Sequence, residues 1–148
     1  MYDRVLLAYD GTLEGRLALR EGALLAKLCK AQLFLLAVIP STTGFAVDAG
    51  ELSPQYESYH AIFREGVARA TLRGLAPVIA EMAHGDPAQE ISAFAHRVSA
   101  DLVVVGHRRK TLLERWWSGS NQSYLVDTLG CSLLVGRKVI SDEVFEAS

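Results

Sequence analysis

The sequence has few cysteines, no long apolar run and no excess of one charge, and each of these excludes a class of protein. Its longest uninterrupted apolar run, Leu33–Ile39, is far shorter than the roughly 20 residues that a membrane-spanning helix needs. The 15 basic and 17 acidic residues leave a formal charge of −2, whereas a protein that binds nucleic acid over its whole surface is normally basic. We therefore expect neither a membrane protein nor a nucleic-acid-binding protein.

The two cysteines, Cys29 and Cys131, form no Cys-x-x-Cys pair and lie among apolar residues. This setting favours buried, reduced thiols over a disulfide, a redox pair or a metal site. The histidines show no ligand spacing either, so we assign no metal ligands. Met1 leads directly into the apolar stretch at Val5 without the basic, apolar and small-residue series of a signal peptide. We therefore expect a cytoplasmic protein.

What the sequence does contain is an alternation of two apolar periods. Short apolar runs typical of buried strands alternate with stretches in which apolar residues recur at helical spacing. The predicted strands are Arg4–Tyr9, Gln32–Ile39, Val78–Met82, Asp101–Val105 and Ser132–Val135. The predicted helices are Leu13–Lys30, Tyr56–Leu72, Pro87–Val98 and Ser120–Leu129, with a loop from Ser41 to Pro54. Asp86 is placed as an N-cap before Pro87, and Gln89 completes a capping-box pattern.

This alternation predicts an α/β fold, a doubly wound five-stranded parallel sheet with helices on both faces. The 148 residues show no linker, repeat or shift in composition, so we expect one domain, residues 1–148, with a tail over 139–148. The tail from Ile140 carries three acids and is expected to fray or to cross to a partner. Ligands of such sheets bind beyond the carboxyl ends of the strands, where the strand order reverses.

Among the segments that follow the strands, Gly106–Ser120 carries the clearest sign of a ligand. Gly106 ends a strand, where a glycine lets the chain turn and a ligand approach without meeting a Cβ. Four cations and one acid follow, which gives a local charge of about +3. Gly119-Ser120 then opens a helix, whose free amides favour an anion. Together these features predict a phosphate-binding loop, and the alternative is a solvated basic loop with an ordinary serine cap.

The same segment resembles the signature of the universal stress protein family, which is a glycine, two residues, a second glycine, nine residues, then glycine and serine or threonine. Gly106 matches the first glycine and Gly119-Ser120 the closing pair. Val5–Thr12 resembles the opening strand of the family, Gly85–Pro87 its third strand–helix junction and Cys131–Arg137 its closing strand. The resemblance implies an adenine nucleotide alpha hydrolase-like fold and an ATP-binding regulatory role in the stress response.

In nucleotide-binding members of the family, ATP lies in the groove at the strand ends. Asp10 would then lie beside the adenosine or a metal-bound phosphate, and the strand-end Gly106 close to the ribose and phosphates. Ala8 and Val38 would line the adenine pocket, with Val105 underneath. The hydrogen-bond donors to the phosphates would be backbone amides or hydroxyls of Gly119, Ser120, Asn121 and Gln122. The implied ligand is ATP or a related adenine nucleotide, with or without Mg²⁺.

Several of these positions leave alternatives open. Arg109 stands where the signature has its second glycine, and it either grips phosphate as a charge-assisted donor or closes the site with its bulk. Asn121 and Gln122 replace smaller residues, so they keep backbone donation but not hydroxyl donation. Asp10, in the sequence Asp-Gly-Thr, is alternatively a turn residue that caps the following helix.

Catalysis finds little support in the sequence. It contains no nucleophile elbow, no P-loop and no GxGxxG after the first strand, so enzymatic activity is limited to slow nucleotide hydrolysis or phosphotransfer. The alternative to a nucleotide-binding regulator is a family member with a closed site that acts as a homodimeric interaction module. We expect the last strand, Ser132–Val135, at a sheet edge, where pairing across a two-fold axis gives a homodimer.

Overall fold

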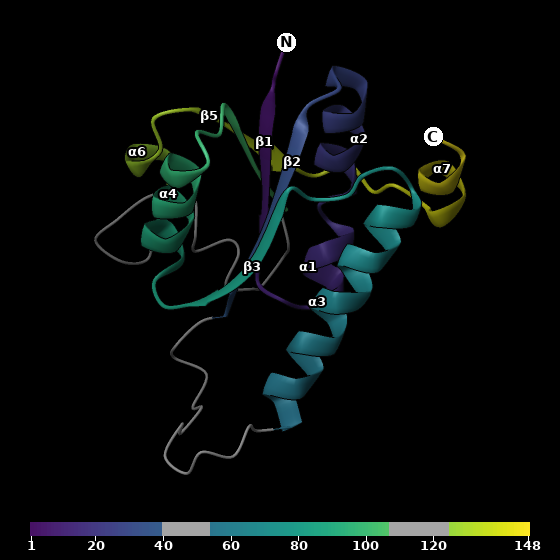
Figure 1. Ribbon diagram of the computed structural model, residues 1–148, viewed down its shortest axis with the longest axis horizontal. Helices are drawn as coiled ribbons and strands as arrows, with labels where there is room; N and C mark the ends of the chain where they lie inside the picture. The colour runs from purple at the N-terminus through teal and green to yellow at the C-terminus, as the bar shows by residue number, and fades with distance from the viewer. Residues whose placement is uncertain (40–53, 107–124) are drawn as a thin grey trace.

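A computed structural model describes residues 1–39, 54–106 and 125–148, and it has the predicted α/β fold (Figure 1). Parallel strands form one sheet in the order β3–β2–β1–β4–β5, so the order reverses between β1 and β4. The strands are β1 (Arg4–Tyr9), β2 (Gln32–Ile39), β3 (Ile79–His84), β4 (Leu102–Gly106) and β5 (Ser132–Gly136). The described helices are α1 (Leu13–Leu17), α2 (Arg20–Cys29), α3 (Pro54–Leu72), α4 (Pro87–Arg97), α6 (Leu125–Thr128) and α7 (Asp142–Ala147).

Two strands keep their predicted bounds and three are shifted by pairing with their neighbours. β1 and β2 match the prediction, because both are continuous apolar runs that are covered on two faces. β3 ends at His84 instead of Met82, since its ladder with β2 continues until His84 lies opposite Ile39. β4 and β5 both extend to a glycine, and these two residues, Gly106 and Gly136, pair with each other. The last strand, β5, is at a sheet edge as predicted.

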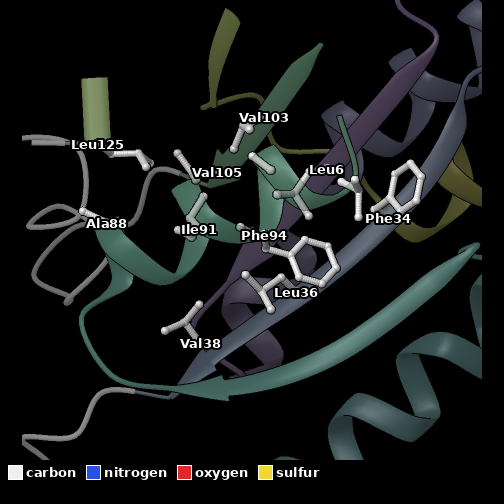
Figure 2. Packing of buried hydrophobic residues seen from close by; sticks show 13 residues of the cluster. Leu6, Phe34, Leu36, Val38, Ala88, Ile91, Phe94, Val103, Val105 and Leu125 are labelled. Atoms are coloured by element: carbon white, nitrogen blue, oxygen red, sulfur yellow. The ribbon is translucent and has the colours of Figure 1, made fainter. Parts of the chain in front are cut away.

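The sheet separates two hydrophobic cores, because successive side chains of a strand point to opposite faces. Figure 1 shows α4 and α6 on one face and α1, α2 and α3 on the other. On the first face, Ile91 and Phe94 of α4 pack on alternate residues of the central strands, as Figure 2 shows. The residues of β1, β2 and β4 in this core are Leu6, Ala8, Phe34, Leu36, Val38, Val103 and Val105. The second core takes the intervening residues, Val5, Leu7, Tyr9, Leu33, Leu35, Ala37, Leu102 and Val104.

The predicted first helix, Leu13–Lys30, is divided into α1 and α2, so the prediction of one continuous helix is wrong. The break at Ala18 and Leu19 lies against the ends of β4 and β5. A Cβ on Gly106 would lie 2.3 Å from the Cβ of Ala18, and one on Gly136 would lie 3.1 Å from its carbonyl oxygen. The leucine spacing continues through the break, and for this reason the sequence does not reveal it.

The start of α4 is as predicted. Asp86 is its N-cap, with Oδ2 accepting a hydrogen bond of 3.1 Å from the amide of Gln89, and Pro87 begins the helix. The described part of the predicted helix Ser120–Leu129 is α6, and its earlier residues lie outside the described ranges. The predicted loop after β2 lies outside them as well, except Pro54, which begins α3.

The C-terminal tail forms a helix that packs on its own chain, which differs from the expectation that it frays or crosses to a partner. Residues 142–147 form α7, whose N-cap Ser141 accepts a hydrogen bond of 3.3 Å from the amide of Val144. Phe145 packs against the second core, on the side of α2 and α3. The tail carries a single aromatic anchor and no apolar repeat, so its docking depends on a surface that other elements build.

The cysteines are free, as predicted, but neither is fully buried. Cys131 lies just before β5, and partial burial, with a contribution from Asp101, raises the pKa of its thiol. None of the described helices is both long enough and apolar enough to span a membrane.

Candidate functional site

The carboxyl end of β1 lies at the point where the strand order reverses, which is where ligands of open α/β sheets bind. In the register of the sheet, Ala8 of β1 lies opposite Val105 of β4. Asp10 follows the end of β1, and Gly106 ends β4. Two residues predicted from the sequence, Asp10 and Gly106, therefore lie at the carboxyl ends of these two neighbouring strands.

Asp10 is the buried charged residue of the described ranges, with an exposed fraction of 6%. Its Oδ1 accepts hydrogen bonds from the amide of Thr12 at 3.1 Å and from the hydroxyl of Thr12 at 2.6 Å. Gly11 between them has a φ of +82°, a conformation that favours glycine. These hydrogen bonds are those of the alternative interpretation, a turn at Asp-Gly-Thr, and contact of Asp10 with a nucleotide stays a prediction.

The cap of the following helix, however, is Thr12. Its hydroxyl donates to Asp10 and accepts from the amide of Gly15 at 3.0 Å, so it links the carboxylate to the first turn of α1. Gly15 lies directly against the carboxylate, because a Cβ there would be 2.3 Å from Oδ1 of Asp10. The turn and the helix thus hold one orientation of the carboxylate before any ligand arrives. Thr12 is not among the site residues predicted from the sequence, although a threonine two residues after an aspartate is a recognisable turn signal.

Tyr9 is a second residue of this region that was not predicted from the sequence. It is fully buried, and within the described part of the chain its hydroxyl has no hydrogen-bond partner. Burial raises the pKa of the phenol well above its ordinary value, an effect that Arg16 opposes and Asp10 increases. A neutral hydroxyl therefore lies beside Asp10 on the α2–α3 side of the sheet. The sequence contains no signal that sets Tyr9 apart, because Tyr9 is simply the last residue of an apolar run.

The three apolar site residues come together on the opposite face, towards α4. Ala8 pairs with Leu36 of β2, and Val38 lies two residues further along the same face, while Val105 pairs with Ala8. All three are fully buried in the first core, and Figure 2 shows Val38 and Val105 there. They form part of the protein core, and their contact with an adenine ring stays a prediction.

Gly106 has a packing reason for being glycine, since Ala18 occupies the space that its Cβ would need. That reason is separate from the close approach of a ligand that the sequence suggested. The other predicted site residues, Arg109, Gly119, Ser120, Asn121 and Gln122, lie outside the described ranges. Within those ranges, no group of three or more histidine, cysteine, aspartate or glutamate side chains could hold a metal ion.

Comparison with known proteins assigns the chain to a family. The sequence profile of the Universal stress protein family matches residues 1–137. A protein of Staphylococcus aureus (strain USA300) that is named for this family is 29% identical over 142 residues, 92% of this chain and 84% of its own.

Solved structures agree with this assignment. The crystal structure of a universal stress protein in complex with cAMP has a TM-score of 0.62 and 25% identity, and the match covers 92% of this chain and 97% of that one. The universal stress protein from Archaeoglobus fulgidus in complex with dAMP has a TM-score of 0.63 at 16% identity, with 92% and 98% covered. This second likeness bears on the fold alone. From the profile match over residues 1–137 we conclude that the chain belongs to the universal stress protein family.

Proposed function

We propose that this protein is an adenine-nucleotide-binding regulator of the stress response. The observation that carries the proposal is the buried carboxylate of Asp10, which the Thr12 turn fixes at the reversal point of the sheet. Two solved structures of similar fold support it, since one was determined with cAMP and the other with dAMP. Bound nucleotide would then shift the conformation of the protein or its choice of partner.

The chemistry of the described residues fits the nucleoside part of such a ligand. A carboxylate accepts hydrogen bonds from a ribose hydroxyl or an amine, and it repels a phosphate unless a cation lies between them. Asp10 would therefore bind the adenosine, with Ala8, Val38 and Val105 forming the apolar side of the pocket. The phosphates would lie towards the basic segment after Gly106, with Arg109, Gly119, Ser120, Asn121 and Gln122 as donors. Mg²⁺ is not required by this arrangement.

Thermal-shift and calorimetric titrations with ATP, AMP and cAMP test the proposal. A ligand that binds only the folded protein stabilises it by RT ln(1 + [L]/Kd), or about 2.7 kcal/mol at a hundredfold excess over Kd. We expect at least one nucleotide to raise Tm with increasing concentration. Asp10→Asn should weaken binding about tenfold, because the amide keeps the size of the side chain but loses its charge. Asp3→Asn, at the opposite end of β1, is the matched control and should bind like the unmodified chain.

Arg109→Gly decides how the basic segment acts. If arginine grips phosphate, the variant binds ATP more weakly while its affinity for adenosine is unchanged. If arginine closes the site, the variant gains affinity for both. A chain that binds none of the nucleotides in either form contradicts the proposal.

A homodimeric interaction module with a closed site is the second candidate, and the edge strand β5 favours it. β5 pairs with β4 on one side, and its residues Leu133, Leu134 and Val135 are only partly buried. An apolar edge of this kind is suited to pairing with a second copy across a two-fold axis. A stable dimer in a chain that binds no nucleotide would support this candidate over the first.

A further inference from the structure

Helix α7 follows the part of the chain that the family profile matches, which ends at residue 137. It lies near the C-terminal end of α3 (Figure 1). Three elements distant in sequence meet here, because Phe145 of α7 packs with residues of α2 and α3 against the second core. The family fold therefore carries on this face an added segment that the proposed nucleotide site does not use.

The contacts of α7 combine one aromatic anchor with two ion pairs. The guanidinium of Arg20 lies 5.0 Å from the centre of the Phe145 ring, and that of Arg73 lies 5.2 Å from it. The same two arginines form ion pairs with acidic residues of α7. Arg20 pairs with Asp142 at 2.5 Å, and Arg73 pairs with Glu146 at 3.1 Å. Arg20 also donates to the carbonyl of Ile140, and Lys27 donates to the backbone of Ser148.

We call the surface beneath α7 the arginine cleft, and define it by Leu17, Arg20, Arg69, Arg73 and Leu75. It contains a mostly apolar cavity of about 90 Å³, which is lined by Phe145 and by Leu7, Leu33 and Leu35 of the sheet. The chain as a whole is slightly acidic, whereas the rim of this cleft carries three arginines. Arg69 pairs with Glu65 at 2.7 Å, and Arg20 and Arg73 are the arginines that bind α7. Such a cleft is complementary to an acidic helix with an aromatic side chain on the same face.

α7 has that pattern, and it is held weakly. Asp142, Phe145 and Glu146 are spaced three and four residues apart, which places them on one side of a helix. No residue of α7 is fully buried, and its acids are mostly exposed, so that salt screens their pairs. A helix of six residues is also too short to be stable alone. The short connection from β5 keeps the segment at high effective concentration at the cleft, which compensates for this weakness.

We propose that the arginine cleft is a docking site for an acidic helical segment with a phenylalanine anchor, and that α7 occupies it as an exchangeable intramolecular ligand. A partner protein that carries a segment of the same chemistry binds this face by displacing α7. The rim of the cleft then places arginines around the phenylalanine anchor. Arginine is enriched among the residues that dominate the binding energy of protein interfaces. This interaction does not depend on a nucleotide.

The test uses the full chain and, as the probe, a fluorescein-labelled peptide with the sequence of residues 138–148. In the double variant Asp142→Asn/Phe145→Ala, α7 binds the arginine cleft less tightly and competes less with the peptide. We therefore expect the peptide to bind this variant at least tenfold more tightly than it binds the unmodified chain. Adding Arg20→Ala and Arg73→Ala to that variant should weaken binding at least tenfold, and raising the salt concentration should do the same. Glu143→Gln, a matched control that removes one charge from α7 outside the described ion pairs, should behave like the unmodified chain. Fluorescence anisotropy measures each affinity.

Three results would overturn the proposal. One is equal peptide binding, or none, in the folded double variant and the unmodified chain. Another is binding that is indifferent to the arginines and to salt. The third is a dimer of the unmodified chain that Phe145→Ala dissociates, because the occupant would then be the helix of a second copy.

Hydrogen exchange of the unmodified chain provides a measurement that needs no variant. We expect the amides of α7 to exchange at least a hundredfold faster than those of β1, through local opening. Exchange of both only on global unfolding would contradict an exchangeable α7.

Discussion

At the scale of single residues, the candidate site depends on side chains that the fold fixes before any ligand binds. Asp10 is held by the amide and hydroxyl of Thr12, and Gly15 leaves just enough space for its carboxylate. Preorganisation of this kind lowers the conformational cost of binding. Beside it, Tyr9 carries a buried hydroxyl without a described partner, which is a cost to stability.

Tyr9→Phe removes that hydroxyl without changing the packing of the ring. We expect the free energy of unfolding to rise by up to about 3 kcal/mol near neutral pH, because no buried polar group is left unpaired. The folded chain holds the phenol proton more tightly than the unfolded chain, so Tyr9 also makes stability fall as pH rises above about 10, the ordinary pKa of tyrosine. Tyr9→Phe should lose this part of the alkaline destabilisation.

Denaturant titrations between pH 7 and 11 measure both effects. Tyr2→Phe, at a partly buried tyrosine, is the control and should change neither. A loss of stability in Tyr9→Phe at neutral pH would mean that the hydroxyl has a bonding role.

At the scale of elements, the junction of α1 and α2 shows how close packing overrides helical periodicity. Ala18 lies in the space beside Gly106 and Gly136, and Gly22 allows α2 to approach Val104 of β4, since a Cβ at Gly22 would lie 2.4 Å from its Cγ1. These glycines let the helices approach the sheet closely. The strand-end glycine that suggested a ligand in the sequence therefore has a structural role as well.

Gly106→Ala separates the two roles. We expect it to reduce the stability of the nucleotide-free protein by about 1–3 kcal/mol, because the added methyl meets Ala18 at 2.3 Å. Gly130→Ala is the matched control, since its Cβ would have no neighbour within 4 Å, and it should change stability by less than about 0.5 kcal/mol. Thermal unfolding of the three chains without ligand makes the comparison. An unchanged Tm in Gly106→Ala would show that the glycine serves the ligand alone.

At the scale of the whole molecule, the exposed features are the two edges of the sheet and the face that carries α7. The edge strands are β3 and β5, and β5 has the longer run of partly exposed apolar residues, Leu133–Val135, whereas Glu81 interrupts the run in β3. Because an unpaired apolar edge strand favours association, this arrangement predicts that two copies of the chain associate.

We expect light scattering to give a dimer at micromolar concentration. Leu133→Lys should shift it towards monomer, because lysine on an edge strand opposes pairing with another strand. Val139→Lys is a matched control at a residue that is 93% exposed beyond the strand, and it should leave the dimer intact. A monomer in the unmodified chain would contradict association through β5.

The sequence by itself determined the fold class, the bounds of β1 and β2, the cap of α4 and the family. These features depend on local patterns: continuous apolar runs, an Asp-Pro helix start and the spacing of Gly106 and Gly119-Ser120. The tertiary structure decided the break between α1 and α2, the full burial of Tyr9, the link from Asp10 through Thr12 to α1, and the docking of α7. Each of these arises from contacts between segments far apart in the chain or from three-dimensional hydrogen bonding, and hydrophobic periodicity carries no information about either.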